Sequence, residues 1–100
     1  MGCDVIIRPE AQLDIEQIFH WYEEKEVGLG HYFILCLDAS IAQLARYPTV
    51  HRIIRHEYRR FFIRKFPVGI FYIVRDQTIH IDVVESLVRK PDRLNKKLRD

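Results

Sequence analysis

The chain has 100 residues, of which 48% are hydrophobic and 30% charged, and its formal net charge is +2. This length fits one small domain spanning residues 1–100, and the hydrophobic fraction excludes a wholly disordered chain. Three basic and eight acidic residues occupy the first half, whereas thirteen basic and six acidic residues occupy the second. The halves predict a polarised surface with a basic side for an anionic partner, unless folding mixes the charges.

Several kinds of site and location are excluded by what the sequence lacks. Its apolar runs fall far short of the roughly 20 residues that span a bilayer, and the N-terminus does not resemble a secretory signal. Cys3 and Cys36 are too few for a disulfide scaffold, so we expect a reduced, cytoplasmic setting. No histidines and cysteines have zinc spacing and no glycine-rich loop could hold phosphate, so we expect no metal and no cofactor.

A short strand and a helix are predicted first. The β-branched run at residues 5–8 is typical of a strand, and Pro9 ends it and opens the helix. Apolar residues recur at helical spacing from Ala11 to Tyr22 and mark the buried side of this helix. Its first turns carry acids that suit the positive end of the helix dipole: Glu10, Asp14 and Glu16.

A second helix follows a break at Gly28 and Gly30. Large apolar residues recur at helical spacing from Leu29 to Leu44, and Tyr47-Pro48 ends the helix. Because the link between the two helices is short and contains glycine, they are predicted to form an antiparallel hairpin.

The second half of the chain changes to strand-like patterns. Residues 59–66 and 70–74 are predicted strands, whereas residues 53–58 are ambiguous. A turn at residues 75–78 leads into a last strand, residues 78–84, whose side chains alternate between two faces. One face is predicted to hold Ile79, Ile81 and Val83, and the other His80, Asp82 and Val84.

These elements predict an α+β fold. An N-terminal strand and a helical hairpin pack on a mainly antiparallel four-stranded sheet, and residues 92–98 form a short basic C-terminal helix or tail.

Several short fragments, in a fixed order, carry a resemblance to a known family. They are Arg8-Pro9-Glu10-Ala11, Trp21-Tyr22-Glu23, Gly28-Leu29-Gly30, Tyr47-Pro48, Arg59-Arg60, Lys65-Phe66-Pro67, Ile70-Phe71-Tyr72 and Arg89-Lys90-Pro91. Over nearly the whole chain they resemble the RelE/ParE superfamily of bacterial toxins, from toxin–antitoxin and plasmid-stabilisation modules. The resemblance implies a growth-inhibiting toxin that a cognate acidic antitoxin neutralises. It also implies either a toxin homodimer or a toxin–antitoxin hetero-oligomer.

Two positions depart from the pattern of the nuclease members of that superfamily. Many relatives carry a His-x-x-Arg-x-Pro exit from the last strand; here Arg89 and Pro91 fit, but Ser86 takes the place of the histidine. In the ribosome-dependent nucleases an arginine commonly precedes the aromatic end of the central strand, and the nearest position in this chain is Gly69. The resemblance therefore favours a ParE-like inhibitor of DNA gyrase over a RelE-type endonuclease that cuts mRNA on the ribosome. An inactive interaction domain is the third alternative.

Basic residues of the second half are the candidate site residues. RNA cleavage through the 2′-hydroxyl needs cations beside the phosphate as well as an acid and a base. The resemblance implies catalytic roles for Arg60 and Arg89, with Ser86 at the altered third position. The nearest acid–base groups are His56, Glu57 and Glu85, with a faint further pair in His80 and Asp82. Other cations are predicted to bind the antitoxin or the target: Arg59, Arg64, Lys65, Lys90, Arg93 and Lys97.

Overall fold

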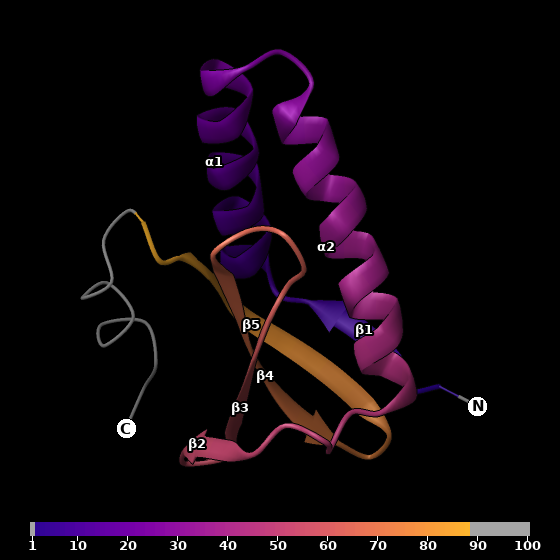
Figure 1. Cartoon of the computed structure of the whole chain (residues 1–100). Helices are drawn as coiled ribbons and strands as arrows, with labels where there is room; N and C mark the ends of the chain where they lie inside the picture. Colours follow the sequence, from indigo (N-terminus) through magenta and orange to yellow (C-terminus); the bar gives the residue numbers. More distant parts are fainter. Residues whose placement is uncertain (1, 89–100) are drawn as a thin grey trace.

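The computed structural model describes residues 2–88 as two helices and five strands. The elements are β1 (Asp4–Ile7), α1 (Pro9–Lys25), α2 (Leu29–Arg46), β2 (Ile53–Arg55), β3 (Tyr58–Phe62), β4 (Val68–Arg75) and β5 (Thr78–Ser86). The strands form one sheet in the order β1-β5-β4-β3-β2, parallel between β1 and β5 and antiparallel elsewhere. Figure 1 shows the helical hairpin on one face of this sheet. The predicted α+β class and helical hairpin are confirmed; the predicted C-terminal helix or tail lies outside the described residues.

The sheet has one strand more than the predicted four. The ambiguous residues 53–58 contain β2, which has only three residues and lies at the sheet edge. Ile53 and Ile54 are both exposed, so the strand has no alternation of buried and exposed residues that a sequence pattern could reveal. The next strand, β3, ends at Phe62 rather than at residue 66, because the chain turns at Lys65, where φ is +70°.

A β-bulge interrupts the pairing of β4 with β5. Tyr72 pairs with Ile81, but its neighbour Phe71 pairs with Val83, so Asp82 is an extra residue on β5. The bulge therefore shifts the alternation of side chains in the second half of this strand.

The shift corrects the predicted faces of β5. Val83 packs with Tyr58 and Phe71 on the face away from the helices, called the far face below. Val84 instead packs in the main core with Ile79. The predicted positions of Val83 and Val84 were therefore wrong, because period-two alternation holds only in an unbroken strand.

The buried carboxylate of Asp14 holds α1 against the bulged strand. Asp14 is 5% exposed, and its Oδ2 accepts the Val84 N–H at 3.1 Å. Since β1 pairs with β5 only as far as Ile81, the side chain takes the place of a strand partner for this buried N–H. The sequence position of Asp14 suggested a role at the helix dipole. In the structure its carboxylate instead acts in the core.

The link between the helices is fixed by Glu23. Its two carboxylate oxygens accept the N–H groups of Gly28 and Gly30, each at 2.9 Å. Gly28 has φ +92°, and a Cβ on Gly30 would lie 2.6 Å from the Phe19 carbonyl oxygen. The Gly28 hydrogen bond, then that of Gly30 and the nearby His31, hold the pKa of Glu23 below its usual value. Both glycines are therefore required by this tight link.

The main core lies between the helical hairpin and the sheet. At the end near the link, Phe66 packs edge-on against Tyr22 and Phe33, with ring centroids 4.8 and 5.5 Å away. Both helices of the described chain, residues 2–88, are too short or too polar to cross a membrane.

Candidate functional site

Basic residues are concentrated where α2 ends and β2 and β3 follow. Residues 46–65 contain seven basic residues and one acidic residue, Glu57. The Glu57 carboxylate is paired with Arg75 on β4, with Oε2 2.6 Å from Nη2, and this pairing lowers the pKa of Glu57. Acidic groups within the stretch therefore do little to offset its positive charge.

Arg60 lies on the far face against two aromatic rings. Its guanidinium carbon is 5.0 Å from the ring centroid of Phe62 and 6.0 Å from that of Phe71. Gly69 is the direct partner of Phe62 on β4, and a Cβ there would lie 3.3 Å from the Phe62 ring. The phenyl ring of Phe62 thus covers Gly69, the position that corresponds most nearly to the arginine of the nuclease members. Arg60 and Phe62 themselves are exposed.

Arg59 points to the helix side and holds the loop that follows α2. Its Nη1 donates to the carbonyl oxygens of His51 at 2.7 Å and Thr49 at 3.3 Å. The Tyr72 hydroxyl donates to the Pro48 carbonyl oxygen at 2.7 Å in the same loop. Burial raises the pKa of Tyr72 to about 12, so the phenol stays a proton donor at neutral pH. The loop is therefore attached to the sheet at several points.

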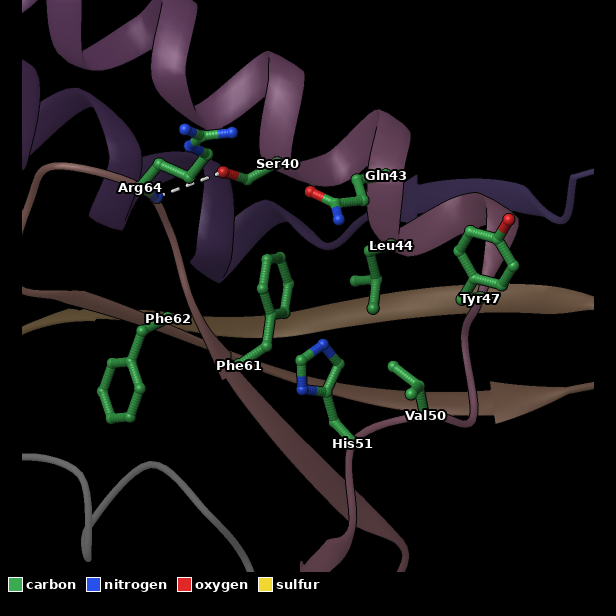
Figure 2. Close-up of a pocket in the computed structure, with 9 residues that line it drawn as sticks. All are labelled: Ser40, Gln43, Leu44, Tyr47, Val50, His51, Phe61, Phe62 and Arg64. Carbon is green, nitrogen blue, oxygen red and sulfur yellow. Dashed lines mark hydrogen bonds between the residues drawn. The ribbon is translucent and has the colours of Figure 1, made fainter.

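A hollow of about 340 Å³ lies between α2, this loop and β3 (Figure 2). We call it the α2–β3 groove. Its lining residues are Ser40, Gln43, Leu44, Tyr47, Val50, His51, Phe61, Phe62 and Arg64. Leu44 and Phe61 form buried walls, whereas Tyr47, Val50 and Phe62 are 59%, 72% and 48% exposed. The groove is thus apolar and accessible, with Arg64 at one end.

A hydrogen bond lies at one end of the groove and a ring contact at the other. The Arg64 N–H donates to Ser40 Oγ at 3.3 Å, which joins the turn after β3 to α2, and Lys65 follows in that turn. At the other end the His51 ring stacks on Phe61, with centroids 5.2 Å apart. Burial lowers the pKa of His51, so its imidazole is neutral at neutral pH.

The structure separates the two predicted catalytic residues that it describes. Ser86 pairs with Val68, lies on the helix side and is 1% exposed, whereas Arg60 lies on the far face. The Ser86 hydroxyl has no hydrogen-bond partner within residues 2–88. The other predicted cations Arg89, Lys90, Arg93 and Lys97 lie outside the described residues.

The candidate acid–base groups are mostly engaged in contacts with other elements. The Asp82 carboxylate accepts the Tyr58 hydroxyl at 2.7 Å across β4, and its other oxygen is 4.0 Å from Arg8 Nη1. Burial, then this hydrogen bond, raises the pKa of Tyr58 to about 12. Glu85 is 4% exposed beside Gly69 on the far face. Asp82 thus binds Tyr58, rather than forming the predicted pair with His80.

The groove itself was not predicted from the sequence. Ser40, Gln43 and Leu44 of α2 and Tyr47 at its end recur at helical spacing, and such spacing does not distinguish a groove wall from a core contact. The sequence shows that Tyr47 and Val50 are apolar and follow the helix, but only the structure shows that they are exposed beside the groove, where contiguous apolar surface marks a candidate binding site.

One comparison with known proteins identifies a family, and another identifies a shared fold. Residues 5–96 match the family described as "ParE toxin of type II toxin-antitoxin system, parDE". No curated protein matches the chain. Among solved structures, a chain of the "Chromosomal ParDE TA system from P. aeruginosa" is similar, with a TM-score of 0.72 and 12% identity. That likeness covers 85% of this chain and 96% of the other, and it shows a shared fold.

Proposed function

This chain belongs to the ParE toxin family of type II toxin–antitoxin systems, and from that premise we propose that it arrests growth in the cytoplasm by inhibiting DNA gyrase. Membership of the family implies a cognate ParD antitoxin. The proposed pair stabilises the replicon that carries it.

The observation that carries the gyrase proposal is the setting of Arg60. A nuclease needs an acid and a base within hydrogen-bond reach of the same phosphate. Arg60 is instead held by the rings of Phe62 and Phe71, and Ser86 is buried on the opposite face. An exposed guanidinium stacked on aromatic rings suits recognition of a carboxylate or phosphate surface. The arrangement therefore supports binding to a macromolecular target more than cleavage of RNA.

The test measures the two activities side by side. The purified chain is added to DNA gyrase and relaxed plasmid, and separately to ribosomes translating a defined mRNA. We expect loss of supercoiling and intact mRNA. Cleavage of mRNA in the ribosomal A site with unchanged supercoiling would overturn the gyrase proposal, and absence of both effects would favour an inactive interaction domain.

Substitutions then test the proposed site residues. Arg60→Ala and Arg89→Ala are each expected to relieve growth inhibition while the protein remains folded. Lys25→Ala is the matched control, because Lys25 also lies over an aromatic ring, 4.7 Å from the centroid of Trp21, but at the end of α1. Full toxicity of both arginine variants would remove the assignment.

A further inference from the structure

The edge of β3 beyond β2 presents unpaired backbone. Ile63 donates its N–H to the Val68 carbonyl, and Phe61 pairs with Ile70, so these odd-numbered residues bond to β4. The N–H and C=O of Phe62 therefore point away from β4. The pairing of β2 ends at Arg59, which leaves these two groups of Phe62 without a strand partner. Such an edge can template an added strand.

The α2–β3 groove lies directly beside this edge (Figure 2). Side chains of an added strand alternate between the two faces, so every second one would point to the helix side, into the hollow between Leu44 and Phe61. The exposed Tyr47 and Val50 would then be covered. The groove, with a volume of about 340 Å³ and a mainly apolar lining, suits an apolar side chain beside the backbone pairing.

Charge decides which kind of strand fits the edge. The surrounding stretch, residues 46–65, has seven basic residues and one acidic residue. A second copy of the chain would bring two such stretches together, and the like charges would repel. An acidic segment would be attracted instead, with Arg64 at the end of the groove as its nearest cation.

We propose that an extended acidic segment of the partner adds to the sheet along Phe62 of β3, and places an apolar side chain in the α2–β3 groove. This inference rests on the proposal that an acidic antitoxin neutralises the chain. It specifies the conformation of the bound segment, which is a strand and not a helix.

Hydrogen exchange of the Phe62 amide tests the proposal directly. The probe is a blocked synthetic peptide in which valine alternates with glutamate. One control has the same composition rearranged to helical spacing, and another replaces glutamate by lysine. At a peptide concentration about ten times the Kd, the alternating acidic peptide is expected to slow exchange of this amide about tenfold. No binding, or binding without slower exchange, overturns the proposal, as does equal binding of the helical-spacing peptide.

A matched pair of variants isolates the backbone donor. Phe62→Ala and Phe62→Pro both remove the ring, but only proline removes the N–H. Proline is tolerated where an edge N–H faces outward. We expect the proline variant to bind the peptide about fivefold more weakly than the alanine variant. Equal affinity of two folded variants would contradict strand addition; if Phe62→Pro does not fold, the exchange measurement decides. Neither assay uses gyrase, so their failure leaves the supercoiling result untouched.

Discussion

The two ends of the helical hairpin are built in contrasting ways. At the link, the Glu23 carboxylate binds the N–H groups of Gly28 and Gly30, and Phe66 fills the space below. At the other end, the loop after α2 is also attached to the sheet, but Tyr47 and Val50 stay exposed beside a groove. Close packing at one end stabilises the fold, while the other keeps apolar surface accessible for a partner.

The largest expected effect comes from a side chain added at the link. In Gly30→Ala, the new Cβ would lie 2.6 Å from the Phe19 carbonyl oxygen and 2.9 Å from Glu23 Oε1. Because the Phe19 carbonyl belongs to the helix backbone, it cannot move away without disturbing the helix. We therefore expect the free energy of unfolding to fall by about 3 kcal/mol. Urea unfolding of the purified protein measures this change.

Gly28→Ala is the matched control for that variant. A Cβ at Gly28 meets nothing within 4 Å, so its only cost is the left-handed φ of +92°. We expect a loss of about 1 kcal/mol. Equal losses in the two variants would show that close approach of the helices is not what fixes the link.

The next effect concerns the contact that joins the hairpin to β5. Asp14→Ala leaves the buried Val84 N–H without its acceptor, and we expect a loss of about 2 kcal/mol in the free energy of unfolding. Faster hydrogen exchange of the Val84 amide should accompany it. Glu16→Ala, an exposed change on the same helix, is the control and is expected to change stability by less than about 0.5 kcal/mol. An unchanged Val84 exchange rate would argue against this contact.

These contacts also mark how far the sequence could predict the structure. Both helices could be predicted, because the spacing of apolar residues and Pro9 are local signals. The β5 bulge could not, because Asp82 is displaced by pairing with β4, and Asp14 supports it from α1. For the same reason Val83 was assigned to the wrong face, and Asp14 was interpreted as an acid that suits the helix dipole.

The candidate site was predictable only in part. The basic second half and Arg60 follow from the sequence, whereas the groove forms only when α2, its following loop and β3 come together. The gyrase assignment came from the family resemblance, since charge alone fits many anionic partners.

A smaller effect is expected at the accessible end. Val50→Glu places a carboxylate in the groove, and we expect the alternating acidic peptide to bind about tenfold more weakly, equivalent to about 1.4 kcal/mol. Stability should change by less than about 0.5 kcal/mol, because Val50 is 72% exposed. Val27→Glu makes the same change at the link, where the side chain is 91% exposed, and should leave binding intact. Equal weakening by both variants would mean that overall charge, not the groove, governs binding. Titration calorimetry measures both.

The smallest expected effect is the pH dependence contributed by Glu23. Hydrogen bonds from Gly28 and Gly30 lower the pKa of this carboxyl in the folded protein below the usual 4.5, and nearby His31 adds to the shift. A group with a depressed folded pKa stabilises the protein fully above its unfolded pKa, and this contribution is lost as the pH falls through the folded pKa. The stability difference between the native protein and Glu23→Gln is therefore expected to be constant near neutral pH and to shrink in acid below about 4.5. Urea unfolding of both proteins across that range checks it. Glu24→Gln, at an exposed position, should show no such trend. If the stability difference between the native protein and Glu23→Gln persists unchanged into strong acid, the link does not depend on the ionised carboxylate.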